Sequence, residues 1–226
     1  MNTRNYSESE FVGHFISYIN GKNIFGHNTF YFEEVITQLG IPDVIMIKRD
    51  NYFDIKDLLV KYPPQVLINK NARLLSVMTK KYHTEDYIFR KSKLNYSTFR
   101  SALRILLKYS IILKNKNCLK LNEEFNIPKI NFWSFEFKLK NWREALMQSL
   151  SYKTFSSFVV IIMPSNKESI LIKNRKVFEN FMIGSAIFSP EKQQVKFIVR
   201  PRKHQNITKS LYIDTLGRLA LSSSVK

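Results

Sequence analysis

Residues 131–152 have the sequence NFWSFEFKLKNWREALMQSLSY, and the fold that we predict follows from this stretch. Its first part, residues 132–139, is mostly apolar and alternates from Ser134 onward, as in a β-strand with one polar and one apolar face. Glu136 and Lys138 are two residues apart, so their side chains point the same way from this strand. A buried ion pair is costly to desolvate, which suggests that the pair has a function.

A helix is predicted directly after this strand. Asn141 can cap its first turn, and Glu144 follows three residues later, which is the capping-box spacing. Gln148 and Tyr152 are four residues apart and share one helical face. The stretch therefore predicts a strand that carries Glu-x-Lys, followed by a helix that carries Gln-x-x-x-Tyr.

This pattern resembles the PD-(D/E)xK nuclease superfamily, and within it the RecB-like branch. There, Glu-x-Lys lies on a core strand, Gln-x-x-x-Tyr lies on the following helix, and an aspartate, often after a proline, lies on a neighbouring strand. In this sequence Pro42-Asp43, followed by the apolar residues 44–47, supplies that aspartate. The resemblance implies an α/β fold with a restriction-endonuclease-like mixed sheet flanked by helices.

The resemblance also implies metal-dependent hydrolysis of phosphodiester bonds. The implied catalytic residues are Asp43, Glu136, Lys138, Gln148 and Tyr152. The implied metal ligands are the carboxylates of Asp43 and Glu136 and the carbonyl of Phe137. Carboxylate oxygens suit Mg²⁺ (or Mn²⁺), which usually keeps waters and substrate oxygens as its other ligands. Lys138 would orient the attacking water or stabilise the charge that develops on the phosphate.

A second Asp-x-Lys motif, Asp54-Ile55-Lys56, follows Asp43 at the spacing usual for the superfamily. It lacks a preceding apolar strand and is predicted to be a loop that enters a helix, so we prefer Glu136 and Lys138. Asp43 by itself is equally compatible with a simple turn residue at the start of a strand.

The chain begins with a predicted amphipathic helix at residues 8–19, with Ser9 as its cap. Glu8 and Glu10 lie in its first turn, where negative charge suits the helix dipole. In the resembled superfamily an acidic residue of the first helix sometimes joins the metal site. A solvated first turn is the simpler interpretation, and we favour it.

Asp43 and Glu136 are 93 residues apart, more than the resembled core needs, and an inserted module accounts for the gap. The elements expected within residues 57–125 are helices at 66–82, 84–90 and 96–109 and a β-hairpin at 111–121. Three helices followed by a small basic hairpin resemble a winged helix-turn-helix domain. We therefore expect residues 1–56 and 126–226 to form one nuclease-like core, interrupted by this insertion at 57–125.

The charge of the chain points to a polyanionic partner. The net charge is +18 over 226 residues, and residues 61–120 hold 14 Lys or Arg against 2 Asp or Glu. The third predicted helix and the hairpin offer side chains that fit phosphates and base edges. These are Ser97, Thr98, Arg100, Ser101, Arg104, Lys108, Lys114, Lys116 and Lys120. The alternative is a basic module with a merely solvated face.

Beyond residue 152, strands are predicted at 157–163, 184–189 and 194–199, and helices near 177–182 and 211–221. The basic stretch at 200–204, Arg-Pro-Arg-Lys-His, is suited to phosphate contacts. Residues 20–28 are predicted to be a turn-rich loop.

Other features narrow the class of protein. No apolar run approaches the roughly 20 residues that span a bilayer, and no clear basic amphipathic helix with exposed apolar residues indicates binding to a membrane surface, so no membrane partner is expected. The single Cys118 excludes an internal disulfide framework and indicates a reducing, cytoplasmic location. Four scattered histidines and one cysteine do not form a zinc motif.

The sequence thus predicts a Mg²⁺-dependent DNA endonuclease or exonuclease that a basic winged-helix domain brings to DNA, with double-stranded DNA as the expected partner. The alternative is a catalytically silent DNA-binding protein of the same fold, acting as a regulator or as a subunit of a larger DNA-processing complex. The resemblance is also compatible with a homodimer, and the choice between DNA and RNA stays open.

Overall fold

The computed structural model describes residues 6–22 and 29–223 and divides into two compact units. The first unit comprises residues 1–50 and 131–207, and the second comprises residues 51–130 and 208–226. The chain therefore leaves the first unit near residue 50, returns near residue 130 and leaves it again near residue 207. The loop predicted at residues 20–28 lies largely outside the described residues.

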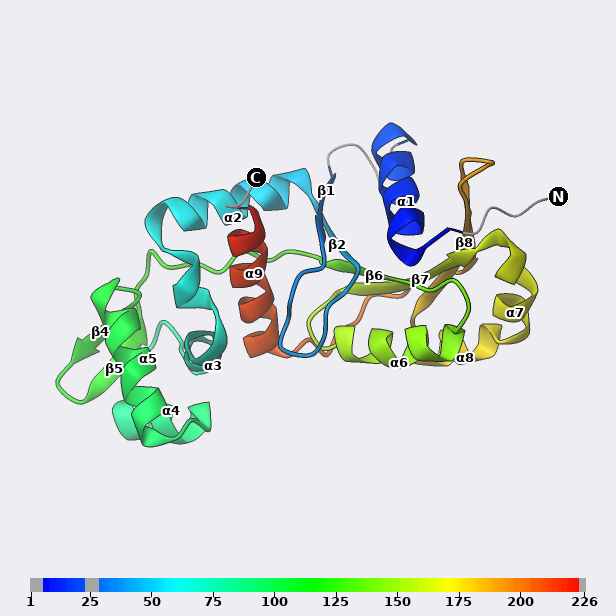
Figure 1. Ribbon diagram of the computed structural model, residues 1–226. Helices are drawn as coiled ribbons and strands as arrows, with labels where there is room; N and C mark the ends of the chain where they lie inside the picture. The colour runs from blue at the N-terminus through cyan, green and yellow to red at the C-terminus, as the bar shows by residue number, and fades with distance from the viewer. Residues whose placement is uncertain (1–5, 23–28, 224–226) are drawn as a thin grey trace. The chain divides into compact units, whose positions relative to one another are not determined.

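The first unit is built on one six-stranded mixed sheet (Figure 1). In spatial order its strands are β1 (Thr29–Glu33), β2 (Val44–Lys48), β6 (Trp133–Phe137), β7 (Phe158–Pro164), β8 (Gly184–Ser189) and β9 (Gln194–Val199). The strands β6, β7 and β8 run parallel, whereas β1–β2, β2–β6 and β8–β9 pair antiparallel. The predicted α/β class, a mixed sheet flanked by helices, is confirmed.

Helices cover both faces of this sheet, with α1 on one side and α6 and α8 on the other (Figure 1). The helical segments of the unit are α1 (Glu8–Lys22), α6 (Trp142–Tyr152), η2 (Ser165–Lys167), α7 (Glu168–Lys173) and α8 (Arg175–Phe181). Phe15 of α1 packs on Phe137 of β6, with ring centroids 5.0 Å apart. Because successive strand residues face opposite ways, Glu136 points away from α1 and toward α6.

Local signals set the ends of two of these helices. Asn141 caps α6 as predicted, because its side-chain oxygen accepts the Glu144 N–H at 3.3 Å. The predicted cap of the first helix was wrong. The helix starts at Glu8, so Ser7 and not Ser9 is its cap. The Ser7 hydroxyl accepts the Glu10 N–H at 3.2 Å, and the Glu10 carboxylate accepts the Ser7 N–H at 2.8 Å.

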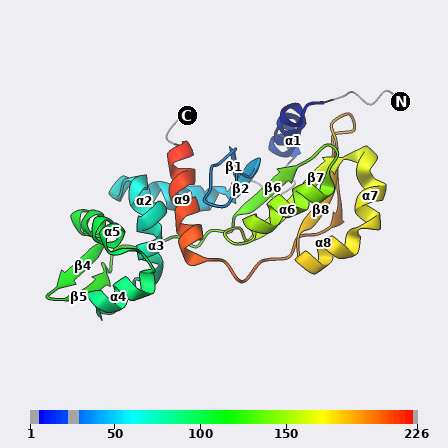
Figure 2. The ribbon, with the colours of Figure 1, turned by 60° about the horizontal axis from the view of Figure 1, so that its bottom comes forward.

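The second unit joins helices to a small antiparallel sheet (Figure 2). Its helices are α2 (Arg49–Lys61), η1 (Pro64–Leu67), α3 (Asn69–Val77), α4 (Glu85–Ser92), α5 (Tyr96–Lys108) and α9 (Lys209–Ser223). Its strands are β3 (His83–Thr84), β4 (Ile112–Asn115) and β5 (Cys118–Leu121), in the order β3-β5-β4. The hairpin β4–β5 and the helices α4 and α5 lie where the sequence predicted them.

Three local predictions in this unit were wrong. The helix expected at 66–82 is split, because Ile68 is extended between η1 and α3, and it ends early, because Met78 is extended. The two-residue strand β3 was not foreseen, since it is too short to show alternation. The motif Asp54-Ile55-Lys56 lies inside the helix α2 and not in a loop.

The C-terminal helix α9 is a correction to the predicted domains, which placed all of 126–226 in the first unit. It packs instead in the second unit, where Asp214 accepts the Asn69 N–H at 2.6 Å. A Cβ at Gly217 would lie 2.6 Å from an Ile68 methyl, so glycine permits this close approach. The predicted limits of the insertion, 57 and 125, become 51 and 130.

Candidate functional site

The strands β2 and β6 bring the two predicted carboxylates together. Val44 pairs with Phe135 in an antiparallel register, which places Asp43 opposite Glu136. Asp43 accepts a hydrogen bond from the Phe137 N–H at 2.7 Å, so its carboxylate is tied to the strand that carries Glu136. The register of two neighbouring strands therefore closes a gap of 93 residues in the sequence.

Glu136 is almost completely buried, with 1% of its surface exposed. Its Oε2 accepts a hydrogen bond from the Tyr152 hydroxyl at 2.9 Å, and its Oε1 lies 3.6 Å from Lys138 Nζ. Burial and then the charge of Asp43 raise the pKa of Glu136 to about 7, although Tyr152 and Lys138 act in the opposite direction. This carboxyl is therefore poised between its neutral and ionised forms near neutral pH.

Asp43 is half-buried, and burial also raises its pKa, against the lowering effect of the Phe137 N–H and Lys138. Two carboxyl groups that both resist ionisation, side by side, are stabilised in the ionised state by a cation. A divalent cation between them would remove this electrostatic cost.

Lys138 supplies one positive charge at this place. Its side chain is 13% exposed, and its ammonium donates to Glu8 Oε2 at 3.1 Å. Burial lowers the pKa of Lys138, but the hydrogen bond that it donates to Glu8 and the charges of Glu136, Glu8 and Asp43 outweigh burial and raise the pKa. Lys138 is therefore an ammonium ion at neutral pH, suited to stabilising negative charge rather than to accepting a proton.

Two acidic residues near the site were not predicted to belong to it. Glu8, in the first turn of α1, accepts a hydrogen bond from Lys138. Glu10 is exposed and accepts the Ser7 N–H at the helix start. Of the two, only Glu10 therefore fits the interpretation of a solvated first turn. Glu34, which has a φ of 48°, donates its N–H to the Asp43 carbonyl at 3.1 Å and helps to raise the pKa of Asp43.

Tyr152 reaches the site from α6, the helix on which the resemblance placed it. Its hydroxyl lies 2.9 Å from Glu136 and 3.1 Å from the Ile41 carbonyl, so it can hold both the carboxylate and the loop before β2. Burial and the charge of Glu136 raise the pKa of Tyr152, which keeps it a hydrogen-bond donor. Gln148 lies one turn earlier, and its buried Oε1 has no hydrogen-bond partner within the described residues. That oxygen is an acceptor suited to a water or another donor.

The residues present fit a cation that keeps several of its waters better than one that the protein encloses completely. Within residues 6–22 and 29–223 no cluster of three His, Cys, Asp or Glu side chains could hold a metal. Two adjacent carboxylates are enough for Mg²⁺, which usually takes one or two of them and keeps several waters. The structure shows Phe137 in contact with Asp43 through its N–H, and its carbonyl as a ligand stays a prediction.

In the second unit, all nine of the predicted nucleic-acid-binding residues are at least partly accessible. Arg100 and Lys114 are exposed but share one partner, since Glu85 accepts from them at 2.6 and 2.7 Å. Burial would raise the pKa of Glu85, but Lys114 and Arg100 outweigh it and lower the pKa. Glu85 thus joins α5 to the hairpin β4–β5 and neutralises part of the predicted surface.

The other predicted residues of this surface differ in their surroundings. Lys120 is paired with Glu123 at 3.0 Å, and Ser101 accepts from Lys70 at 2.7 Å. Ser97 donates to Asn95 at 3.0 Å, Thr98 is half-buried, and Lys108 lies 5.6 Å from the centre of the Tyr109 ring. Arg104 and Lys116 are exposed and make no side-chain hydrogen bond or ion pair within the described chain.

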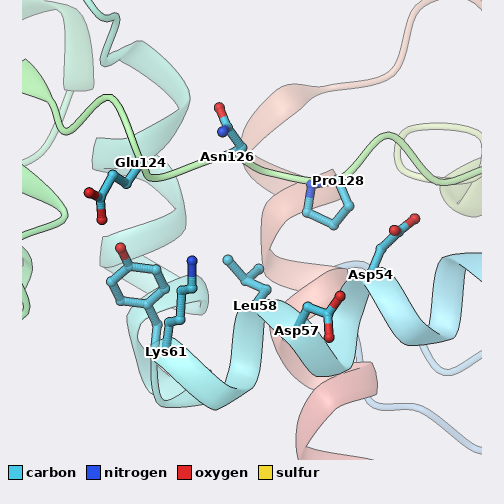
Figure 3. Close-up of a pocket in the computed structure, with 8 residues that line it drawn as sticks. Asp54, Asp57, Leu58, Lys61, Glu124, Asn126 and Pro128 are labelled. Atoms are coloured by element: carbon cyan, nitrogen blue, oxygen red, sulfur yellow. The ribbon is translucent and has the colours of Figure 1, made fainter.

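The rival motif lies in a different setting. Asp54 is on α2 in the second unit and lines a groove of about 340 Å³ with Asp57, Lys61, Glu124 and Asn126 (Figure 3). In Figure 3, Leu58 and Lys61 extend from α2 toward the segment that carries Asn126, whereas the Asn126 side chain points away from α2. Because it lies on a helix, the rival motif does not present two side chains from one strand, and we set it aside.

Comparison of this chain with protein-family models, with curated proteins and with solved structures finds no match. Among the helices of the described residues, none has the length and apolar character needed to cross a membrane. The case for a function therefore rests on the residues of this chain.

Proposed function

We propose that this protein is a metal-dependent deoxyribonuclease of the PD-(D/E)xK type. The observation that carries the proposal is the convergence of Asp43, Glu136 and Lys138 where the neighbouring strands β2 and β6 begin and end, with Tyr152 bonded to the buried Glu136. A structural ion pair would not need a second, destabilised carboxyl group beside it.

The arrangement of the first unit supports a restriction-endonuclease-like core. The aspartate precedes β2, Glu-x-Lys lies on the adjacent strand β6, and Gln-x-x-x-Tyr lies on α6, the helix that follows. This is the order that the resemblance implies. Residues 51–130 leave the first unit between β2 and β6, which accounts for the long gap in the motif.

The chemistry that we propose divides among these residues. A bound Mg²⁺ would supply Lewis-acid activation of the phosphate and of a water. Asp43 and Glu136 would hold it, and Tyr152 keeps the Glu136 carboxylate oriented through its hydroxyl. The ammonium of Lys138 would stabilise the negative charge that grows on the phosphate in the transition state.

We further propose that the second unit is a winged-helix DNA-binding domain. It has three helices, α3 to α5, of which the last two are joined by a short turn, and then a basic hairpin. Asn95 caps α5 by accepting the Thr98 N–H at 2.8 Å, and Ser97 and Arg100 in its first turns are exposed. Arg104 and Lys116 are the exposed cations best placed to bind phosphates of double-stranded DNA.

A second candidate function keeps the fold and omits catalysis. Lys138 is already bonded to Glu8, and the described residues provide only two carboxylates for a metal. Both facts are compatible with a DNA-binding subunit that has lost, or never had, nuclease activity.

A cleavage assay separates the two. The full-length protein would be incubated with plasmid, linear and single-stranded DNA in Mg²⁺, Mn²⁺ or EDTA, beside Asp43→Asn and Lys138→Met. Lys56→Met removes the same charge from the rival motif and serves as the matched control. For a nuclease, we expect metal-dependent cleavage that falls about 10²–10³-fold in Lys138→Met and persists in Lys56→Met.

Absence of cleavage under all conditions, with salt-sensitive DNA binding that survives both substitutions, would favour the silent DNA-binding protein. Cleavage that survives both Asp43→Asn and Lys138→Met would place the active site elsewhere.

A further inference from the structure

The positive charge on the helix α5 of the second unit is neutralised at one edge and not across the rest of its outer face. At the edge beside the hairpin, Glu85 accepts hydrogen bonds from Arg100 and Lys114 at 2.6 and 2.7 Å. Arg104 and Lys108, on the outer face, are exposed and have no ion pair within the described residues. The charge that α5 can offer to a partner is therefore shifted away from the Glu85 edge.

The helix α3 adds two cations beside the other edge of α5. Lys70 Nζ donates to Ser101 Oγ at 2.7 Å, and Arg73 Nε donates to the carbonyl of Ser92, the last residue of α4, at 2.9 Å. An ammonium has three N–H donors and a guanidinium has five, so both side chains keep donors for a partner. Two cations that the sequence analysis did not select are thus fixed next to α5.

Together these side chains form one basic surface, which we call the α3–α5 face. Ser97, Ser101, Arg104 and Lys108 are spaced by three or four residues, so they share one side of α5. Lys93 directly follows Ser92 and is exposed. The cations of the α3–α5 face are Lys70, Arg73, Lys93, Arg104 and Lys108. Neither α3 nor α5 contains an Asp or a Glu, so this charge has no acidic neighbour on its own helices.

The length of the α3–α5 face fits a repeating polyanion better than a small anion. From Ser97 to Lys108 the helix rises about 16 Å, at about 1.5 Å per residue. Each strand of a DNA duplex carries one phosphate per about 3.4 Å of its axis, so several phosphates can lie along this length. Among the described residues, neither α3 nor α5 exposes a large aliphatic side chain, which a helix bound to a membrane surface would need.

We propose that the α3–α5 face binds the phosphate backbone of double-stranded DNA, and that Arg100 and Lys114 join only when Glu85 is displaced. Cations fixed on two packed helices match the regular backbone of a duplex, and the serine hydroxyls can donate to phosphate oxygens. The helix α3, through Lys70 and Arg73, is then part of the interface. The inference rests on the proposed function for the assignment of the polyanion to DNA.

The test measures binding of the full-length protein to a short fluorescent duplex by anisotropy, in EDTA and over a range of salt concentrations. Lys70→Gln with Arg73→Gln should lower the affinity on the order of tenfold and reduce the slope of log affinity against log salt by about 1.8. Because these two side chains also tie α3 to its neighbours, Arg104→Gln with Lys108→Gln is a second pair on the same face. Neither of those side chains is bonded to another element within the described residues, and we expect the same reduction in slope.

Lys61→Gln with Lys81→Gln is the matched control, because both lysines are exposed in the same unit and lie outside α3 and α5. We expect less than a twofold change in affinity there, and a loss equal to that of the Lys70 and Arg73 pair would overturn the proposal. Tighter binding of a single strand than of the duplex would also overturn it. So would equally tight binding of vesicles of anionic phospholipid.

The part played by Glu85 is tested with one further substitution. Arg100→Gln should leave the slope almost unchanged in the otherwise unmodified protein, because Glu85 already holds that guanidinium. In the Glu85→Gln background the same substitution should reduce the slope by about 0.9, the effect of one phosphate contact. An equal reduction in both backgrounds would show that Arg100 binds the backbone without displacement of Glu85.

The outcome is distinct from those that test the proposed function. Duplex binding that depends on Lys70 and Arg73, without cleavage in Mg²⁺ or Mn²⁺, would support this inference and contradict the proposed nuclease. Duplex binding with an unchanged slope in the Lys70 and Arg73 variant would contradict this inference alone. Absence of any binding to DNA would contradict both this inference and the proposed winged-helix domain.

Discussion

At the scale of single residues, the buried Glu136 carboxyl governs the pH dependence that we expect of the first unit. Its pKa of about 7 lies above the ordinary value of 4.5. Below pH 4.5 the group is protonated in both the folded and unfolded states and imposes no electrostatic cost. As the pH rises toward 7, the unfolded chain releases this proton first, so the free energy of unfolding falls, by on the order of 3 kcal/mol in total.

Glu136→Gln should remove this penalty, because glutamine has no charge and its carbonyl can still accept from Tyr152. In EDTA we expect the variant to raise the free energy of unfolding by roughly 2–3 kcal/mol at pH 8 and to change it little at pH 4.5. Urea denaturation at the two pH values measures this. An effect of the same size at both would show that ionisation of Glu136 is not its cause.

Residue spacing predicted some of the side chains of this site and missed others. Strand and helix periodicity place Glu136 with Lys138 on one face and Gln148 with Tyr152 on another. The resemblance to the superfamily, and not periodicity, pointed to Asp43 and to one shared site. The sequence did not show whether Glu8 or Glu10 lies near the site, because this depends on the residue at which α1 begins. The buried oxygen of Gln148 depends on packing, which a spacing does not reveal.

At the scale of elements, the loop between β1 and β2 positions Tyr152 through a glycine. Gly40 has a φ of +141°, and a Cβ there would lie 3.0 Å from the Tyr152 ring. Gly40→Ala should therefore shift the ring, loosen its hydrogen bond to Glu136 and lower the free energy of unfolding by about 1–3 kcal/mol. Cleavage activity, if present, should fall with it.

Gly13→Ala is the matched control, because Gly13 lies within the helix α1 and a Cβ there meets nothing within 4 Å. Alanine should stabilise that helix by about 0.5–1 kcal/mol. Thermal unfolding of the two variants gives the comparison, and Gly40→Ala that is as stable as Gly13→Ala would refute the proposed contact.

Glu85 makes a second prediction at this scale, because it bridges α5 and the hairpin and occupies both Arg100 and Lys114. Glu85→Gln should free these cations for phosphates. We expect several-fold tighter binding to double-stranded DNA at low salt, with a slope of log affinity against log salt that is steeper by about 1–2.

Asp86→Asn is the matched control, because it removes the same charge from the neighbouring residue. Asp86 pairs with exposed Arg90 across one helical turn and makes no bridge to α5 or the hairpin within the described residues. Fluorescence anisotropy at two salt concentrations measures both variants. If Asp86→Asn strengthens binding as much as Glu85→Gln, the gain reflects overall charge and not release of the bridge.

The ends of elements were predictable where a local chemical signal marks them. Thr84 caps α4 by accepting the Tyr87 N–H, and Asn95 caps α5, so both helices begin where the sequence indicates. The break at Ile68 has no such signal, because apolar residues continue through it. Strand β3 forms because His83 pairs with Leu119, a contact between distant residues.

At the scale of the whole molecule, periodicity shows that a helix has an apolar face but not which partner covers it. The helix α9 illustrates this, since its spacing fits either unit. Its place in the second unit follows from two contacts: Asp214 accepts a hydrogen bond from the Asn69 N–H, and Gly217 packs closely on Ile68. The helix α9 therefore belongs to the second unit, although residues 131–207 before it belong to the first.

The two units also suggest a division of roles, with binding in the second and chemistry in the first. Arg104→Gln with Lys116→Gln should weaken binding to double-stranded DNA regardless of its sequence. Two lost phosphate contacts should reduce the slope of log affinity against log salt by about 1.8. The rate of cleavage at saturating DNA should be unchanged, because neither side chain lies in the unit that carries Glu136.

Lys61→Gln with Lys81→Gln removes the same charge from exposed positions of the same unit, outside α5 and the hairpin. Anisotropy titrations from low to high salt, together with cleavage rates at saturating DNA, measure both pairs. If both pairs change the slope equally, the α5–hairpin surface is not the binding site. If the cleavage rate falls at saturation in the Arg104 and Lys116 variant only, these residues act on the bound substrate and the proposed division between the units is wrong.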